Sequence, residues 1–445
     1  MPMTFPWTSI FRSTLAFAAL YIFANATAAA IYASGQGQMF KPGKYDQPPT
    51  GIDSVKGECA GKIALTPTPK FFHGGYPYAV IYHCSTKTFE ILKTNQRDAT
   101  LVSLNDLTLT HNGYYLHEGK ITNQRWKGEY VFYDVEGNRT RAIEDPRDPK
   151  VHDLFVEDTN LTRIRYVPDW DAARCGRAAP LEMEITTEDL NGKILWTWST
   201  KGRFDIGHNV STVQSTYAPA IPGWRQMLHA IRHCYTSIVR SGFDITLPDL
   251  STLRQNGLTF FKLEVEDHIH ANSIQRLESA EDILVSAKHL DTVFVIDRRS
   301  GAIKWMLGGK FAKATANRPR GDPRGGFSHP HYARIEGNML WVFDNGNLFP
   351  HLPSRVVGYL LTSGQLPVRM AFEMQEPNGI RRPELGSVQL LQNDQLLIGW
   401  GGYDYSEATK PQRGVSIVRT ADRREVFTID FSPGWMSYRA KALQP

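Results

Sequence analysis

A strand–turn–strand pattern recurs along most of this chain and constrains its fold more than any other feature. Apolar residues alternate with polar ones, the chain turns at Gly, Asn or Asp, and the alternation then resumes, often up to an aromatic residue. Two of six examples are VFVIDRRSGAIKWML and VSIVRTADRREVFTI. Alternation with a period of two on both sides of a short polar turn is typical of a β-hairpin. The chain is therefore predicted to be all-β.

The regular spacing of these hairpins favours a six-bladed β-propeller. Most are about 50–65 residues apart, which is close to the length of a four-stranded blade repeat. The six turns lie near residues 85, 137, 192, 301, 364 and 422. One or two β-sandwiches built from unrelated hairpins are the alternative. We expect the propeller to occupy residues 61–445, after a linker over residues 31–60.

The longest interval between two turns contains an insertion with a different pattern. Apolar residues recur at steps of three and four from Trp224 to Ile238, between Pro222-Gly223 and Gly242. This spacing predicts one amphipathic helix near residues 222–241, packed on the propeller rim rather than on a membrane surface. Two further roles for such a helix are to cover a site and to form a homodimer contact.

The first thirty residues have a composition of their own. Arg12 is the only charged residue among them, residues 15–23 are apolar, and small residues follow up to Ala30. This order is typical of a secretory signal peptide over residues 1–30, cleaved after Ala28 or Ala30. A retained membrane anchor is the alternative, although the apolar run is shorter than the roughly 20 residues that a span needs. We expect a mature protein in the periplasm or outside the cell.

Export would place the cysteines in an oxidising compartment, where disulfides form. The chain has four of them, and sequence leaves their pairing open. They are Cys59, Cys84, Cys175 and Cys234. No two form a Cys-x-x-Cys pair, which makes structural zinc and thioredoxin-type redox chemistry poor hypotheses.

The charge distribution argues against a nucleic-acid partner. The net charge is +5, from 50 basic and 45 acidic residues, and no Lys/Arg block stands out. Hydrophobic content of 41% and charged content of 21% are ordinary for a soluble globular protein. A small anionic molecule bound in a local basic site remains compatible with this balance.

Histidines lie at the ends of several expected strands. The stretches are His152-Asp153, DHIHANSI at residues 267–274 and FSHPHYARI at residues 327–335. Strand ends from different blades converge at one end of a propeller, so such residues can meet around one small molecule. An ordinary loop histidine without chemistry is the alternative for each stretch taken singly.

Two of these stretches contain a His-x-His pair. Strand alternation would place His268 and His270 on one face, and His329 and His331 repeat the spacing. Zinc and copper sites use this spacing, so a metal site is one hypothesis.

The order and detail of the stretches resemble the arylsulfotransferases, which are secreted six-bladed propeller enzymes. The similarity extends from about residue 150 to residue 402. It rests on the His-Asp element at 152–153, DHIHANSI at 267–274, SAKH at 286–289, IDRRSGAIKWMLGG at 296–309, the FSHPH element at 327–331 and FDN at 343–345. Several ordered elements are far more specific than any single one.

The resemblance implies ping-pong transfer of a sulfuryl group from an aryl sulfate to a phenol, with no nucleotide donor, no cofactor and no metal. His331 falls on the family's nucleophile, and a neutral imidazole suits the formation of a sulfohistidine. His270 and His152 carry over as further catalytic residues. Asn272 and Lys288 carry over as substrate-binding residues, with His270 and Asn272 facing the sulfuryl oxygens from one strand.

Three residues depart from the family pattern. Lys288 replaces an arginine, which keeps the charge but loses the planar fork that binds two oxygens together. Pro330 replaces a glutamine before the nucleophile and removes a backbone N–H, and Tyr332 replaces an acidic residue.

These departures keep two other functions open. One is a metal-dependent hydrolase or oxidase, and the other is a non-catalytic propeller that binds a partner. The metal hypothesis would use His268, His270, His329 and His331.

Overall fold

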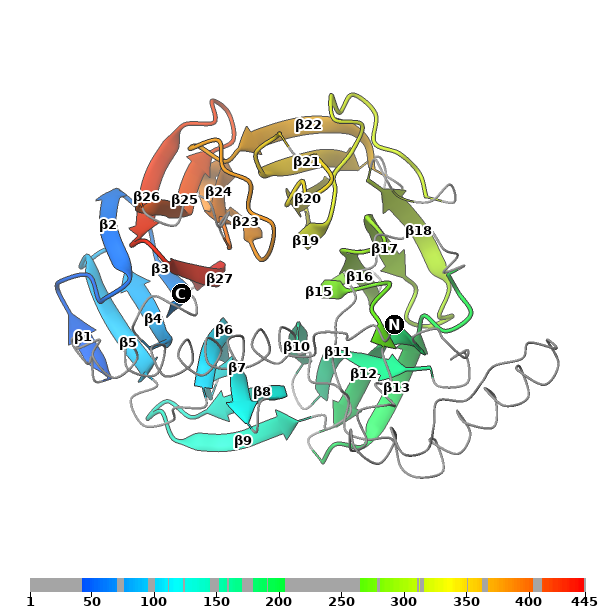
Figure 1. Ribbon diagram of the computed structural model, residues 1–445, viewed down its shortest axis with the longest axis horizontal. Coiled ribbons are helices and arrows are strands. Elements are labelled where there is room, and N and C mark those ends of the chain that lie inside the picture. Colours follow the sequence, from blue (N-terminus) through cyan, green and yellow to red (C-terminus); the bar gives the residue numbers. More distant parts are fainter. Residues whose placement is uncertain are drawn as a thin grey trace, which may run out of the picture.

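The described strands form six antiparallel sheets arranged in a ring (Figure 1). The computed structural model describes residues 42–204 and 265–443, except 70–75, 95–100, 111, 123–124, 145–151, 158–159, 170–178, 190, 278–280, 310–311, 313–315, 350, 362–366 and 403–409. The prediction of an all-β, six-bladed propeller is confirmed.

The first three blades each contain four or more strands, which are named here from the innermost strand outward. Blade 1 contains β27 (Trp435–Leu443), β3 (Lys62–Pro69), β4 (Tyr78–His83), β5 (Thr88–Thr94) and β1 (Gly43–Tyr45). Blade 2 contains β6 (Leu101–Thr110), β7 (Gly113–Thr122), β8 (Arg125–Tyr133) and β9 (Arg139–Glu144). Blade 3 contains β10 (Leu154–Glu157), β11 (Asn160–Pro168), β12 (Ala179–Asp189) and β13 (Ile194–Ser199), and β14 (Val265–Glu266) pairs with β12 in parallel.

The other three blades follow the same order. Blade 4 contains β15 (Ala271–Leu277), β16 (Asp282–Ala287), β17 (Thr292–Ile296) and β18 (Ile303–Gly308). Blade 5 contains β19 (Pro330–Glu336), β20 (Met339–Asp344), β21 (Arg355–Leu361) and β22 (Pro367–Gln375). Blade 6 contains β23 (Ser387–Leu391), β24 (Gln395–Gly399), β25 (Gln412–Arg419), β26 (Glu425–Phe431) and β2 (Ile52–Gly57), with a 3-10 turn at Gln392–Asp394.

The six predicted hairpins occupy the same place in every blade. Each joins the third and fourth strands from the inside, as β17 and β18 do around the turn at Asp297–Gly301. The corresponding pairs are β4–β5, β8–β9, β12–β13, β21–β22 and β25–β26. The regular spacing of hairpins seen in the sequence is therefore the spacing between the outer hairpins of successive blades.

The hydrophobic core consists of layers between neighbouring blades. Along β16, Ile283 and Val285 face blade 3, whereas Leu284 between them faces blade 5. Both faces of this strand are buried, since successive side chains of a strand point to opposite sides. Burying one such aliphatic side chain contributes about 1.5–3 kcal/mol. The packing of blade on blade thereby fixes where the inner strands lie.

The ring is closed by strands from both ends of the chain. The C-terminal strand β27 is the innermost strand of blade 1, next to β3, and the early strand β2 is the outer strand of blade 6, next to β26. Residues 43–57 thus belong to the propeller sheets, so the expected boundary at residue 61 lies too late. The reason is that β2 completes the last blade before the chain enters the first.

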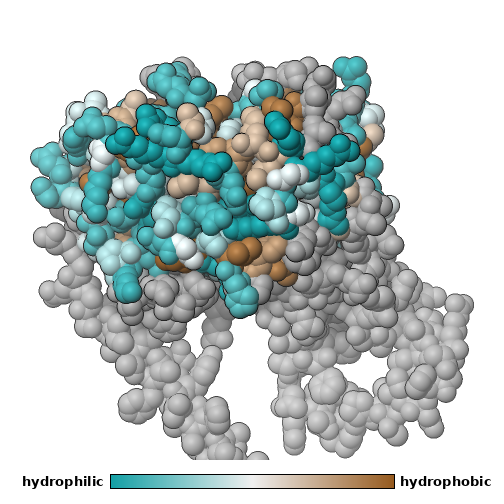
Figure 2. All heavy atoms as spheres, turned by 90° about the horizontal axis from the view of Figure 1, so that it is seen from above, coloured by the Kyte–Doolittle hydropathy of each residue, from teal (hydrophilic) through white to brown (hydrophobic). Residues whose placement is uncertain are grey.

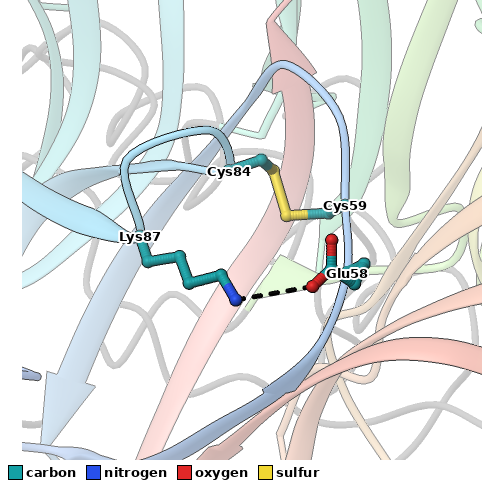
Figure 3. The surroundings of a disulfide bond; sticks show 4 residues. All are labelled: Glu58, Cys59, Cys84 and Lys87. Atoms are coloured by element: carbon teal, nitrogen blue, oxygen red, sulfur yellow. Dashed lines mark hydrogen bonds and ion pairs between the residues drawn. A yellow bond between two sulfur atoms is a disulfide. The ribbon is translucent and has the colours of Figure 1, made fainter.

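A disulfide links the short connection between β2 and β3 to the end of β4 in blade 1. Cys59 follows β2 and Cys84 follows β4, and their Cα atoms are 5.3 Å apart (Figure 3). The exposed side chains of Lys87 and Glu58 form an ion pair beside it at 3.4 Å. Cys175 and Cys234 lie outside the described residues.

Two expected elements also fall outside the described part of the chain. They are the signal peptide over residues 1–30 and the amphipathic helix near 222–241, and neither prediction is confirmed. Within the described residues, no helix has the length and apolar character needed to cross a membrane. The described part of the face drawn in Figure 2 is mostly hydrophilic, with small apolar areas between polar side chains.

Candidate functional site

β-Bulges on the inner strands orient several of the predicted site residues. The pairing of β15 with β16 skips Asn272, and the pairing of β19 with β20 skips His331. On β27, Tyr438 and Arg439 are skipped in the same way. A bulge turns its extra residue away from the ordinary alternation of the strand, and bulges are common next to active sites. Three blades therefore direct bulged residues into one region.

His270 and His329 precede their strands instead of lying within them, so the prediction that strand alternation aligns the two His-x-His pairs is wrong. β15 begins at Ala271 and β19 at Pro330. Both histidines have a left-handed backbone, with φ of 47° and 53°. The cost of this conformation, about 1–2 kcal/mol per residue, is offset by Asp267 and Asp291, whose carboxylates accept the two backbone N–H groups at 2.9 and 2.6 Å.

The turns before three inner strands, together with the turn after β16, bring four histidine rings into a chain. The ring of His270 lies 4.8 Å from that of His152 in blade 3 and 4.5 Å from that of His289, which follows β16. The ring of His289 lies 5.9 Å from that of His329. His152 and His270, which are far apart in the sequence, therefore meet as predicted, and His289 joins them.

Asp267 holds two of these rings. Its carboxylate accepts a hydrogen bond from Nδ1 of His270 at 2.6 Å, and its backbone carbonyl accepts one from Nδ1 of His289 at 2.5 Å. Burial, together with the ring of His270, lowers the pKa of His289 to about 2. His289 is therefore a neutral ring at any ordinary pH.

The same three residues have the composition of a metal site. Asp267, His270 and His289 each offer a ligand atom, and these atoms lie within 4.8 Å of one another. One pair of these atoms, Nδ1 of His270 and Oδ2 of Asp267, is already joined by a hydrogen bond, and Nδ1 of His289 donates to the backbone carbonyl of Asp267 instead of its carboxylate. The predicted set of His268, His270, His329 and His331 differs from this group, with only His270 in common.

His331 is buried beside the histidine chain. Burial lowers its pKa well below the ordinary value of 6.5, and the cation of Lys288 and the rings of His270 and His152 lower it further. Its Nδ1 is buried and has no hydrogen-bond partner among the described residues. The ring of Tyr438 lies 6.2 Å away, edge to face. His331 is thus a neutral imidazole close to the positive charge of Lys288.

Asn272 fixes the peptide that precedes His331. Its Nδ2 donates to the carbonyl of Pro330 at 2.9 Å, and Ser286 Oγ donates to the same oxygen at 3.3 Å. Asn272 Oδ1 is buried without a hydrogen-bond partner among the described residues. The structure therefore shows Asn272 positioning the backbone at His331, a contact that the resemblance did not imply.

A buried arginine joins four blades beneath these residues. Arg439 of blade 1 donates from Nη1 to Asp153 of blade 3 at 2.8 Å, pairs with Asp106 of blade 2 at 3.1 Å, and donates from Nη2 to the carbonyl of Asn272 in blade 4 at 2.7 Å. Burial alone would lower the pKa of Arg439, but Asp106 and Asp153 raise it well above its ordinary value. Asp153 also accepts the backbone N–H of Ile274 at 2.9 Å.

Sequence reasoning did not find Arg439, Tyr438 or Asp106. No motif surrounds them, and they reach the site because the C-terminal strand returns to the first blade. In the sequence Asp153 stands out only as the second residue of the His-Asp element, whereas in the structure it is a carboxylate that binds Arg439.

Between blades 2 and 3, His117 contributes to the pH dependence of stability. Burial lowers its pKa to about 4, and neither ring nitrogen has a hydrogen-bond partner among the described residues. Because the unfolded chain binds this proton at about pH 6.5 and the folded one does not, stability falls as the pH falls from about 6.5 to about 4.

We expect His117→Leu to remove this part of the pH dependence. The free energy of unfolding of the variant, measured in urea at several pH values, should fall less steeply between pH 6.5 and 4, by up to about 1.4 kcal/mol per pH unit. At pH 7 the variant should be at least as stable as the native chain, because the ring of His117 makes no hydrogen bond to any residue that the structure describes. Parallel pH curves for the two proteins would contradict the assignment.

The fold and site define a class of protein: a six-bladed propeller whose inner strands bring a buried neutral histidine, further histidines and a lysine together. The sequence of this region adds a particular similarity, because residues 241–404 match the family model described as arylsulfotransferase (ASST). This match covers His270, Asn272, Lys288 and His331, and it confirms the predicted resemblance.

Other comparisons add only distant similarities. No curated protein matches the chain. A protein of unknown function from Bacteroides caccae is similar, with 11% identity, a TM-score of 0.47, and coverage of 86% of this chain and 98% of its own. The β-propeller domain of Cps50 (Swd1) from Myceliophteria thermophila gives 10% identity, a TM-score of 0.39, and coverage of 86% and 87%.

Proposed function

We propose that this protein transfers a sulfuryl group from an aryl sulfate to a phenol through a sulfohistidine on His331. The observation that carries the proposal is the buried, neutral ring of His331 beside Lys288, His270 and His152. A neutral imidazole is a nucleophile at neutral pH and does not need to lose a proton before it attacks. The family match over residues 241–404 supports the same chemistry.

The reaction consists of two displacements at sulfur. A ring nitrogen of His331 attacks the sulfur of the aryl sulfate, and the bond from sulfur to the aryl oxygen breaks, so that the phenol leaves with the electron pair. An acceptor phenol then attacks the same sulfur, and the nitrogen–sulfur bond breaks. No nucleotide donor takes part in either step.

In this proposal, Lys288 neutralises charge during both displacements. Its backbone N–H donates to the carbonyl of His270 at 3.0 Å, which fixes the start of the side chain, and its cation acts on His331. A fixed positive charge in a buried site stabilises the sulfuryl oxygens more strongly than it would in water. Lysine binds them as a point charge rather than through two parallel hydrogen bonds.

The test is detection of the sulfuryl adduct on His331. The protein is mixed briefly with 4-nitrophenyl sulfate, quenched at alkaline pH and digested with trypsin, which cuts after Arg324 and Arg334. The peptide between these sites contains both His329 and His331, so fragment ions must place the added SO₃. We expect it on His331. Turnover with an unmodified peptide, or with the adduct on His329, would contradict the proposal.

A metal-dependent hydrolase or oxidase is the second candidate, favoured by the arrangement of Asp267, His270 and His289. Metal analysis of protein purified without added metal, with activity measured before and after a chelator, separates the two functions. Stoichiometric metal and loss of activity on chelation would favour the second candidate over sulfuryl transfer.

Export to the periplasm or the cell exterior is part of the proposal. The composition of residues 1–30 and the disulfide between Cys59 and Cys84, which is a bond typical of oxidising compartments, support it. Sequencing the N-terminus of the mature protein should show cleavage after Ala28 or Ala30.

A further inference from the structure

We propose that Asp267 is a positioning residue that makes His270 the acid–base group for the phenolic oxygen. This inference rests on the proposed function and assigns the proton transfer within it. The geometry on which it stands is a double attachment: Oδ1 of Asp267 accepts the backbone N–H of His270 at 2.9 Å, and Oδ2 accepts its Nδ1–H at 2.6 Å. Asp267 is fully buried, so water does not screen the pair.

The carboxylate determines which ring nitrogen of His270 exchanges protons. An ionised carboxylate only accepts hydrogen bonds, so Nδ1 of His270 carries a proton in both the neutral and the cationic ring. Nε2 therefore has the lone pair in the neutral ring and a proton in the cation. The buried negative charge also stabilises the cation, as the aspartate does for the histidine of a serine protease triad.

The neighbouring histidines are less suited to this role. His289 donates its Nδ1–H to a neutral carbonyl, and its Nδ1 lies 3.9 Å from the carboxylate of Asp267, too far for a hydrogen bond. His329 faces Asp291 at 3.3 Å, through the oxygen that already accepts the backbone N–H of His329. His331 is needed as the nucleophile. His152 is the remaining candidate, and a variant of it belongs in the test.

The proton balance closes over the two half-reactions. As the His331 nitrogen–sulfur bond forms and the sulfur–oxygen bond breaks, Nε2–H of His270 gives its proton to the departing aryl oxygen, and the ring becomes neutral. In the second half, Nε2 takes the proton of the acceptor phenol as its oxygen attacks sulfur. His270 then returns to its starting state.

Asp267→Asn should therefore act selectively on poor leaving groups. Phenyl sulfate releases a weakly acidic phenol that needs protonation, whereas 4-nitrophenyl sulfate releases a stable phenolate that does not. General acid catalysis contributes roughly 10²–10⁴-fold. We expect kcat/KM to fall by about 10²-fold or more with phenyl sulfate and by less than about 10-fold with 4-nitrophenyl sulfate. His270→Gln should show the same pattern, and the double variant should lose little more than His270→Gln alone.

Asp291→Asn is the matched control, because Asp291 is also a buried aspartate bonded to a left-handed histidine. Any loss there should be equal for the two donors. Equal losses in Asp267→Asn, or the selective loss in His152→Gln instead, would overturn the assignment while the adduct on His331 still supports sulfuryl transfer. A native protein that turns over neither donor would overturn the proposed function and this inference together.

Discussion

His331→Ala should lose sulfuryl transfer by about 10⁴-fold or more, measured as kcat/KM with 4-nitrophenyl sulfate and a phenol acceptor. Removing the nucleophile of a covalent mechanism removes the reaction path itself, and only binding and electrostatic stabilisation remain. The loss should be the same for every donor, since all donors share the sulfohistidine. This uniformity separates the nucleophile from a residue that acts on the leaving group.

The control for this variant is His329→Ala, two residues earlier in the same segment. The ring of His329 also lies in the histidine chain and is buried, so a general disturbance of the site would affect both variants alike. We expect a much smaller loss for His329→Ala. Thermal unfolding of both variants checks that each is folded. Retained transfer in His331→Ala would reject the assignment of the nucleophile.

Arg439→Met should destabilise the protein by about 3–5 kcal/mol, measured as the free energy of unfolding in urea. The variant keeps a side chain of similar length but leaves Asp153 with only the more distant cation of Arg334, at 3.5 Å, and Asp106 with Lys441. Breaking a buried ion pair from one side costs this much because the remaining charge stays desolvated. The loss should grow with rising pH, because Arg439 helps to lower the pKa of Asp106 against the effect of burial, and this part of the stability is present only where that carboxylate is ionised.

A second substitution tests this explanation. Adding Asp153→Asn to Arg439→Met should recover part of the lost stability, because the asparagine carries no charge to leave unpaired. Arg419→Ala serves as the surface control: Arg419 pairs with Asp422, and both side chains are nearly half exposed. We expect no measurable change there. A loss in Arg439→Met that Asp153→Asn does not reduce would point to packing instead of charge.

The architecture could be predicted from sequence because its repeating unit is local. Each outer hairpin is formed by residues close together in the chain, and its alternation and turn residues are visible in a short window. The boundary at residue 61 failed for the opposite reason. The partner of β2 is β26, almost at the other end of the chain, and no local pattern shows this pairing.

The candidate site could be predicted only in part. The motifs identified the histidines, and His152 and His270 do lie together. Their orientation could not be predicted from alternation, because the bulge at His331 and the left-handed backbone at His270 depend on pairing and on hydrogen bonds from neighbouring turns. Arg439 was missed because a lone arginine in an alternating strand looks like an exposed residue until its partners are known.

Two strand pairings close the ring, β27 with β3 and β2 with β26, and each joins residues that are far apart in the sequence. Ser54 bonds to Asp430, 376 residues away, and the N–H of Thr66 bonds to Ser437, 371 residues away. During synthesis, blade 1 lacks its innermost strand until residues 435–443 have been made, and blade 6 must pair with an outer strand, residues 52–57, that was made before β3. Pairing between such distant residues slows folding, and unpaired strand edges promote aggregation in the meantime. Ring completion is thus expected to be the late, rate-limiting event, and deleting β27 should trap the chain just before it.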